Sequence, residues 1–354
     1  MKILVTGGIG FIGSHIAEYH AAKGDEVVVI DNLSRGTLLG KPVFNYDYTI
    51  NHLAEYKNIR FVKADIRDFK VLSEAAAGCD LIFHAASQTA VTASLLNPAE
   101  DFTSNVVGTF NVLEAARTNG VGTVVYCSTN KVYGNNVNNV GIVENSTRYV
   151  FEDAYRNGIP ETFPIDRCEH TPYGCSKLSG DIYCQEYAHR YGIRTCNLRM
   201  SCIYGTRQFG VEDQGWVAWL VYATLRGLPI TIYGDGKQIR DLLFISDLVD
   251  LYARFLVSEI PNGVFNVGGG REFTVSIIEL LDILYNVTGK RSAVTFAEWR
   301  HSDQKAYVSD IGKASTELQW QPQISPREGI DRLVSFISGC SLLEGIDASL
   351  PGKH

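Results

Sequence analysis

Short apolar segments alternate with longer amphipathic segments along the first half of the chain. The short segments are rich in Val and Ile and are bounded by Gly, Asp or Asn. They are residues 3–6, 26–30, 59–62, 80–84 and 123–127. The segments that begin near Phe11, Asp68 and Asp101 carry apolar residues at helical spacing. Because continuous apolar strands between amphipathic helices are typical of a parallel sheet covered on both faces, we predict a Rossmann-type, doubly wound α/β fold.

The rhythm of the pattern changes in the second half of the chain. Helical and strand patterns alternate there, at residues 214–226, 230–233, 247–257, 264–267 and 275–284. We predict a Rossmann domain at residues 1–200 with an insertion at about 135–167, followed by a smaller α/β lobe formed mainly by residues 201–340. The chain is expected to cross between the two lobes. Residues 341–354 contain Gly, Pro and Lys and are expected to form a tail.

The composition argues against several classes of protein. The net charge is −7, whereas nucleic acids and anionic lipids are recognised through clustered positive charge. No apolar run approaches the roughly 18 residues that span a bilayer, and glycines interrupt the N-terminus before a secretory core forms. The eight cysteines include no C-x-x-C pair and show no zinc spacing. We therefore expect a cytoplasmic protein with reduced thiols, no metal, and no nucleic-acid or membrane partner.

The first predicted strand ends in a glycine-rich turn that opens a helix. Gly7, Gly10 and Gly13 have the spacing of a dinucleotide-binding turn, in which the backbone approaches a pyrophosphate and helix N–H groups face the phosphates. Asp31 ends the second strand about 20 residues beyond Gly10, where a carboxylate accepts from the ribose 2′-hydroxyl and repels a 2′-phosphate. This favours NAD over NADP. Arg35 lies close behind Asp31 and leaves NADP open.

A second group of residues indicates proton and hydride transfer. Tyr173 and Lys177 are four residues apart in a predicted helix and so share one face, and Thr129 follows the fifth predicted strand. A free phenol has a pKa of about 10, but a nearby ammonium and a nicotinamide cation both favour the phenolate. We expect Tyr173 to exchange a proton with a substrate hydroxyl that Thr129 holds, while the nicotinamide exchanges hydride with the carbon.

These motifs together resemble the extended short-chain dehydrogenase/reductase family, which acts largely on nucleotide-sugars. The resemblance runs from residue 1 to about 335 and implies tightly bound NAD. The implied cofactor contacts are Gly7, Gly10, Phe11, Ile12, Gly13, Asp31, Asn32, Ser34, Arg35, Asp65, Ile66, Ala85, Ala86, Gln88, Asn105, Tyr173 and Lys177. The resemblance also implies a homodimer that pairs through the helices starting near Asp101 and Tyr173.

The residues after Thr129 narrow the choice within this family. Sugar-nucleotide 4,6-dehydratases carry an Asp-Glu pair there, whereas this chain has Asn130 and Lys131 and so lacks that carboxylate pair. The sequence around this pair, and again at 201–216, resembles the CDP-paratose/CDP-tyvelose 2-epimerase group rather than UDP-glucose 4-epimerases. The implied substrate contacts are Gln88, Thr129, Asn130, Lys131, Val211, Gln238, Arg240 and Arg300. We also expect the long connection at 135–167 to form part of the sugar or base pocket.

The expected reaction inverts a ring carbon of a nucleotide-sugar through transient oxidation to a keto-sugar, rotation and re-reduction. The resemblance implies C2 of a CDP-linked hexose or dideoxyhexose. A UDP-hexose 4-epimerase uses the same hydride chemistry and is the main alternative, followed by a nucleotide-sugar dehydratase or reductase. A dinucleotide-sensing protein without activity would keep the fold alone, and the presence of Thr129, Tyr173 and Lys177 argues against it.

Overall fold

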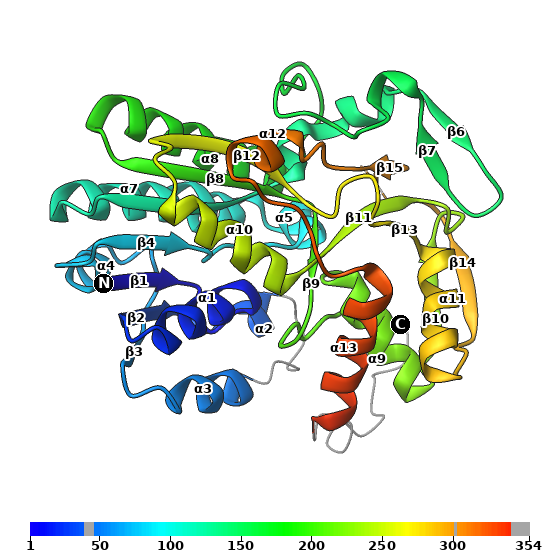
Figure 1. The fold of residues 1–354 in the computed structure, drawn as a ribbon, viewed down its shortest axis with the longest axis horizontal. Coiled ribbons are helices and arrows are strands. Elements are labelled where there is room, and N and C mark those ends of the chain that lie inside the picture. The colour runs from blue at the N-terminus through cyan, green and yellow to red at the C-terminus, as the bar shows by residue number, and fades with distance from the viewer. Residues whose placement is uncertain (39–45, 301–302, 341–354) are drawn as a thin grey trace.

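The computed structural model describes residues 1–38, 46–300 and 303–340. Its centre is a seven-stranded sheet in the order β12-β8-β5-β4-β1-β2-β3, in which every neighbouring pair is parallel (Figure 1). The strands are β1 (Lys2–Thr6), β2 (Glu26–Asp31), β3 (Ile59–Lys63), β4 (Leu81–His84), β5 (Thr123–Thr129), β8 (Arg194–Met200) and β12 (Asn262–Val267). This sheet confirms the predicted fold class. The predicted tail at 341–354 lies outside the described residues.

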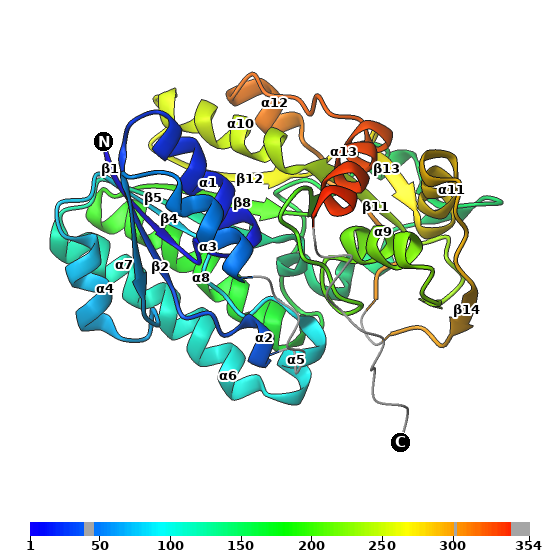
Figure 2. The ribbon, with the colours of Figure 1, turned by 90° about the horizontal axis from the view of Figure 1, so that it is seen from below.

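Helices cover both faces of the sheet, as Figure 2 shows. One layer contains α1 (Phe11–Ala22), α3 (Tyr46–Ala54) and α10 (Ile245–Val257), and the other contains α4 (Phe69–Ala76), α7 (Gly108–Asn119) and α8 (Thr171–Tyr191). Successive residues of a strand enter opposite layers: Ile3 and Val5 join the core beneath α1, and Leu4 joins the core beneath α7. Both faces of each strand are therefore apolar, which explains the continuous apolar runs in the sequence.

Short helical segments link the main elements of the Rossmann domain. They are α2 (Arg35–Leu38), α5 (Val91–Leu96), α6 (Pro98–Phe102), a π-helical turn η1 (Thr103–Val107) and the 3-10 segments η2 (Asn130–Asn139) and η3 (Asp153–Tyr155). α8 has a proline in its first turn and ends at Gly192 in the left-handed conformation, with φ of 68°. Proline tolerates the first turn and glycine tolerates this φ at little cost, so the sequence fixes both ends of α8.

Within the described residues, the second lobe is built from small sheets and three helices. Its elements are β9 (Cys202–Tyr204), α9 (Trp216–Arg226), β10 (Ile230–Tyr233), β11 (Ile239–Phe244), β13 (Thr274–Ser276), α11 (Ile277–Thr288), β14 (Val294–Ala297), β15 (Ala306–Tyr307) and α13 (Pro326–Gly339). α12 (Gly312–Glu317) lies between β15 and α13 in the chain and packs against β12 of the main sheet. β11 lies between β13 and β15 and also pairs with β9, and β10 pairs with β14. Within the described ranges, no helix combines the length and the apolar character that a membrane crossing requires.

The chain returns from the second lobe to the main sheet. The strand predicted at 264–267 within the smaller lobe is β12, which forms the edge of the seven-stranded sheet beside β8. α10, just before it, packs against α1, where His20 and Tyr252 are joined by a 2.6 Å hydrogen bond. A short apolar run does not reveal which sheet it joins, because the pairing is decided by tertiary packing. The chain therefore runs from β8 in the main sheet through residues 201–244 and then back to β12 in the same sheet.

The insertion forms a hairpin that packs on the second lobe. Its strands are β6 (Ile142–Glu144) and β7 (Tyr149–Phe151), which extend to the right in Figure 1. Arg148 forms a salt bridge with Glu279 at the start of α11, and the backbone N–H of Tyr149 donates to the carbonyl of Lys237 at 3.0 Å. These contacts join the insertion to the second lobe.

Candidate active site

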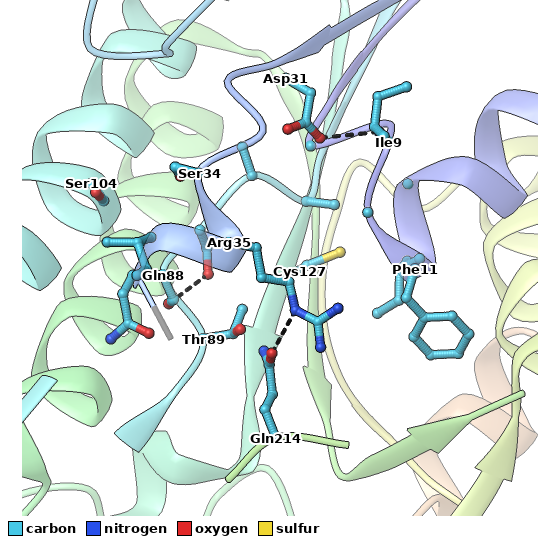
Figure 3. A pocket seen from close by; sticks show the side chains of 18 of the residues that line it. Ile9, Phe11, Asp31, Ser34, Arg35, Gln88, Thr89, Ser104, Cys127 and Gln214 are labelled. Atoms are coloured by element: carbon cyan, nitrogen blue, oxygen red, sulfur yellow. Dashed lines mark hydrogen bonds between the residues drawn. The ribbon is translucent and has the colours of Figure 1, made fainter. Parts of the chain in front are cut away.

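A long cavity lies at the carboxyl ends of the parallel strands. The strand order reverses between β1 and β4, and ligands of such sheets bind at this reversal. The cavity is lined by sixteen of the predicted cofactor contacts (Figure 3). These are Gly7, Gly10, Phe11, Ile12, Gly13, Asp31, Asn32, Ser34, Arg35, Asp65, Ile66, Ala85, Ala86, Gln88, Tyr173 and Lys177.

The glycine turn has the shape that a pyrophosphate needs. Gly7 has a φ of +68°, and a Cβ atom there would lie 2.6 Å from the backbone N of Ala86. A Cβ atom on Gly13 would lie 2.2 Å from the Gly7 carbonyl oxygen. Any side chain at these positions would therefore force the turn, β4 and α1 apart. The three segments meet closely enough for backbone N–H groups to reach phosphate oxygens.

Asp31 is fixed at the end of β2 by backbone donors. Its carboxylate accepts from Ile9 N at 3.0 Å and from Leu33 N at 2.9 Å, and burial raises the pKa of Asp31. Arg35, which left NADP open, has other partners. Its Nε donates to Gln214 Oε1 at 2.7 Å (Figure 3). Its Nη2 donates to the Phe209 carbonyl at 3.1 Å. Asp31 thus remains suited to a ribose hydroxyl, while Arg35 is engaged by the opposite wall.

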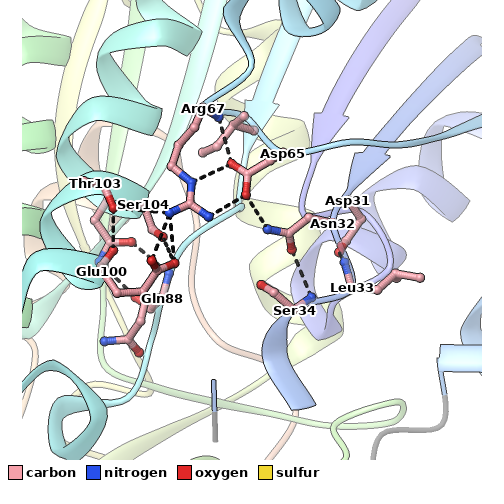
Figure 4. Close-up of polar contacts among 12 residues, drawn as sticks. Asp31, Asn32, Leu33, Ser34, Asp65, Arg67, Gln88, Glu100, Thr103 and Ser104 are labelled. Carbon is pink, nitrogen blue, oxygen red and sulfur yellow. Dashed lines mark hydrogen bonds and ion pairs between the residues drawn. The ribbon is translucent and has the colours of Figure 1, made fainter. Parts of the chain in front are cut away.

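The end of β3 carries a polar network beside the same cavity (Figure 4). Asn32 Nδ2 donates to Asp65 Oδ2 at 2.8 Å, so two predicted cofactor contacts are joined to each other. Arg67 binds Asp65 through Nε at 2.9 Å and Nη2 at 2.7 Å, and reaches Glu100 at 3.0 Å. Burial raises the pKa of Asp65, but the bonds from Arg67 and Asn32 outweigh it and lower the pKa overall. Arg67 therefore holds this loop, a role for which sequence reasoning gave no residue.

Asn105 supports the residues around the cavity but does not line it. Its side chain is 1% exposed and lies in the π-helical turn η1. Asn105 Nδ2 donates to the Gln88 carbonyl at 2.9 Å and to Ser176 Oγ at 3.0 Å, while its Oδ1 accepts from Gln88 N at 2.8 Å. The Asn105 amide thus bonds to protein groups, and Asn105 lies outside the lining of the cavity. Gln88 lines the cavity, but its own amide donates to Asp101 at 2.9 Å.

Thr129, Tyr173 and Lys177 are brought together at the inner end of the cavity. Thr129 ends β5 and hydrogen-bonds with the Tyr173 hydroxyl from the first turn of α8. Burial raises the pKa of Tyr173 to about 12, and the bond with Thr129 opposes this rise. The Lys177 ammonium lies 4.2 Å from the centroid of the Tyr126 ring, and burial lowers its pKa to about 8.

These shifts correct one step of the sequence argument. We expected the ammonium of Lys177 to lower the pKa of Tyr173, but burial has the larger effect and Lys177 is not among its causes. The phenol is consequently the protonated form at neutral pH. A base at this position needs a cation close to the hydroxyl, since only an added positive charge offsets the burial.

The predicted substrate contacts divide into two groups. All eight lie within the described ranges, and Gln88 and Thr129 line the cavity. The six that lie outside its lining are Asn130, Lys131, Val211, Gln238, Arg240 and Arg300. Arg240 on β11 forms a salt bridge with Asp303 at 2.9 Å. Lys131 faces both of these groups; burial and the charge of Arg240 lower the pKa of Lys131 to about 8.

Arg300 and Gln238 belong to a neighbouring cluster around Tyr233. The Arg300 guanidinium lies 3.9 Å from the centroid of the Tyr233 ring and 3.1 Å from Asp213 Oδ1. Gln238 Nε2 donates to the Tyr233 carbonyl at 2.7 Å, while its Oε1 is buried without a hydrogen-bond partner among the described residues. Cationic and aromatic groups therefore collect in the second lobe, at a distance from the lining of the cavity.

The loop between β9 and α9 supplies lining residues that sequence reasoning missed. They are Arg207, Gln208, Phe209, Gln214 and Gly215. α3 adds Tyr46 and Thr49, for which no motif gave a signal. The segment 201–216 was recognised as similar to a family segment, but its position over the Rossmann domain depends on tertiary packing. Residues 135–167, all of which are described, contribute no lining residue, so this cavity does not contain the pocket wall expected from the insertion.

The glycine-rich dinucleotide turn lines the same cavity as Thr129, Tyr173 and Lys177. This combination is typical of a dehydrogenase-type site for hydride and proton exchange. Residues 3–268 match the NAD dependent epimerase/dehydratase family, and the chain belongs to this family. A CDP-paratose 2-epimerase of Salmonella typhi is 37% identical over 96% of this chain and 99% of its own length.

Solved structures agree with this assignment. The UDP-glucose 4-epimerase of Thermotoga maritima, solved with UDP-glucose, superposes with a TM-score of 0.79 at 30% identity and covers 96% of this chain and 99% of its own. The UDP-glucuronic acid 4-epimerase of Bacillus cereus, solved with UDP-glucuronic acid and NAD, gives 0.78 at 28% identity with the same coverage of both chains. The predicted family, enzyme class and cofactor NAD are confirmed.

Proposed function

We propose that this enzyme is an epimerase that inverts C2 of a CDP-linked hexose or dideoxyhexose by oxidation, rotation and re-reduction. One observation carries the proposal: Thr129, Tyr173 and Lys177 meet in the NAD cavity, and the residues after Thr129 are Asn130 and Lys131. The site has groups for hydride and proton exchange with a secondary alcohol. It lacks the carboxylate pair after Thr129 that 4,6-dehydration would use.

The side chains divide the reaction between them. Thr129 orients the substrate hydroxyl, and Tyr173 accepts its proton as the hydride leaves the ring carbon; Tyr173 acts here as the phenolate, the form that the positive charge of a bound nicotinamide would favour. When bound, NAD accepts that hydride and supplies it again for the return step. The keto-sugar rotates, and Tyr173 gives its proton back to the carbonyl oxygen as the hydride adds to the other face. Lys177 keeps a positive charge beneath this site as long as the pH stays below its pKa of about 8.

We expect the nucleotide part of the substrate to bind to the second lobe. Arg240 and Lys131 place two cationic groups near one another, with Asp303 beside them. A guanidinium suits a diphosphate because it donates two parallel hydrogen bonds. Arg300 stacked on Tyr233 forms a further cationic surface in the same lobe. A diphosphate near Arg240 would extend the sugar toward Thr129.

The assignment to C2 and CDP rests on sequence similarity. The 37% identity to a CDP-paratose 2-epimerase extends over nearly the whole of both chains. The alternative, a UDP-hexose 4-epimerase, is favoured by the likeness to a structure solved with UDP-glucose. Both reactions use the same Thr129, Tyr173 and Lys177, so the substrate alone separates them.

NMR in H2O, with the solvent signal suppressed, tests this proposal. The protein is incubated with CDP-, UDP-, GDP- and dTDP-linked hexoses and dideoxyhexoses, including a CDP-sugar that carries deuterium at C2. Inversion at C2 with retention of the C2 deuterium supports oxidation and return of the same hydride. Inversion at C4 favours the alternative, and loss of the C2 deuterium to solvent indicates proton abstraction beside a carbonyl. An absence of turnover with every substrate contradicts the proposal.

We also propose that two copies of the chain pair through the outer faces of α7 and α8. Phe110 and Tyr183 are 41% and 43% exposed and contact each other, and Phe102 and Ile182 are exposed nearby on the same helical layer. An apolar patch of this kind is typical of an interface. Light scattering during gel filtration should show a dimer for the natural chain and a monomer for Phe110→Glu. A monomeric natural chain would contradict this arrangement.

A further inference from the structure

A loop from the second lobe covers one side of the cavity. We call residues 205–215 the cover loop; it connects β9 to α9. Five of its residues line the same cavity as the glycine turn of β1. The loop therefore faces the dinucleotide side of the site, although it follows the segment that resembles a substrate-binding motif.

One side of the cover loop is fastened to α1. The backbone carbonyl of Thr206 is 2.9 Å from His15 Nε2, and Arg207 Nε donates to Ser14 Oγ at 3.2 Å. Arg207 also forms a salt bridge with Glu18, and Arg207 is 6% exposed. These contacts fix the loop beside the helix whose N-terminus faces the phosphates.

The other side of the cover loop is fastened by Arg35. This residue begins α2, just beyond Asp31, and its guanidinium extends across the cavity to Gln214 and to the Phe209 carbonyl (Figure 3). Reciprocal backbone bonds between Val211 and Gln214, at 2.8 and 2.9 Å, hold the far end of the loop in a tight turn. Arg35 thus joins the adenosine side of the Rossmann domain to the second lobe.

We propose that the hydrogen bond between Arg35 and Gln214 retains NAD in the cavity between the two hydride transfers. The glycine turn and Asp31 would hold NAD in the cavity that Arg35 and Gln214 also line, so its release would require this contact to open. Retention suits the chemistry, because the hydride taken from the sugar must return to the same sugar. This role of Arg35 replaces the 2′-phosphate acceptor that its sequence position suggested. The proposal concerns NAD alone and holds for any sugar substrate.

The rate of NAD release tests this proposal without any sugar. Purified protein loaded with NAD is mixed with alcohol dehydrogenase, ethanol and semicarbazide, which convert each released NAD to NADH, and absorbance at 340 nm is followed. We expect Arg35→Ala and Gln214→Ala each to release NAD at least about tenfold faster than the natural chain, as the loss of one charge-assisted contact implies. The double variant should match Arg35→Ala, because that variant has already lost the contact with Gln214.

The control is Arg60→Ala, which removes an exposed arginine from β3 of the same domain and should leave the release rate unchanged. If Arg35→Ala does not fold, Gln214→Ala carries the test alone. Equal release rates in the natural chain and the variants would overturn the proposal, and so would additive effects in the double variant. Loss of NADP binding in Arg35→Ala with unchanged NAD release would restore the 2′-phosphate role. A failed NMR assay would leave this measurement unaffected.

Discussion

The two ends of the proposed site are built in different ways. At the NAD end, the glycine turn and Asp31 lie at strand ends of one sheet, and backbone N–H groups of Ile9 and Leu33 hold the Asp31 carboxylate. At the substrate end, Lys131 from η2 meets Arg240 from β11 and Asp303 from the chain before β15. A site made from one local motif tolerates little change, whereas a site collected from distant segments can change its specificity one segment at a time.

The largest effect is expected at the junction of the two ends. Tyr173→Phe removes the hydroxyl that exchanges the proton, so turnover should fall by about 10³-fold, within the usual range for loss of an acid/base group. NAD should remain bound, because the turn and Asp31 are untouched. Turnover is measured by NMR and bound NAD by absorbance after gel filtration. Tyr191→Phe, at the exposed C-terminal end of α8, is the control and should keep full activity; equal turnover in both variants would exclude this role for Tyr173.

A second effect concerns the charge of Lys177. Burial lowers the pKa of Lys177 to about 8, so its positive charge is lost as the pH rises through that value. We expect kcat/KM to fall above about pH 8, and Lys177→Met to lower the rate by about 10²-fold and to abolish this fall. Lys131 also has a pKa of about 8, so Lys131→Gln is the matched control and should keep the alkaline fall. The reverse pattern would assign the titration to Lys131.

A smaller effect is expected at the substrate end. Arg240→Ala removes the proposed diphosphate ligand and should raise KM by about tenfold, which corresponds to about 1.4 kcal/mol. NAD release should not change, because Arg240 lies outside the cavity lining. Steady-state kinetics measure the first quantity and the NAD trap measures the second. Arg254→Ala, which removes an exposed salt bridge on α10, is the control. If Arg240→Ala changed NAD release but not KM, Arg240 would belong to the NAD end of the site, and the proposed contact with the diphosphate would be wrong.

The smallest effect is expected in the insertion. Arg148→Ala removes the salt bridge to Glu279 and a hydrogen bond to Thr274, and should cost about 1 kcal/mol of unfolding free energy. Because the insertion contributes no lining residue within the described chain, KM should stay within about twofold, below the tenfold that 1.4 kcal/mol produces. Chemical denaturation and steady-state kinetics check the two quantities. If Arg148→Ala raised KM without changing the free energy of unfolding, the insertion would form part of the substrate pocket after all.

The sequence was informative wherever function depends on local spacing. The glycine turn, Asp31, and the Tyr173 and Lys177 pair each lie within one element or at its end, so spacing alone placed them in the cavity. Strand runs such as 230–233 were also found at their observed positions as β10 (Ile230–Tyr233). In each case the motif itself is formed by residues that lie close together along the chain.

The sequence was uninformative wherever distant segments meet. Arg207 and Gln214 reach the NAD cavity only because the cover loop folds back onto α1 and α2. Asn105 was placed at the site but its bonding to Gln88 and Ser176 required side-chain positions from three segments. The pKa of Tyr173 depends on burial, which spacing does not report.

The return of α10 and β12 to the main sheet affects how specificity can be exchanged between relatives. β12 completes the edge beside β8, and α12 packs against β12, so two separate stretches of the C-terminal half belong to the Rossmann domain. A chimaera with a single junction near residue 200 would import a foreign edge strand along with the new substrate lobe. A conservative graft would exchange the segments before α10, between β12 and α12, and after α12, and leave the native residues 245–267 and 312–317 in place.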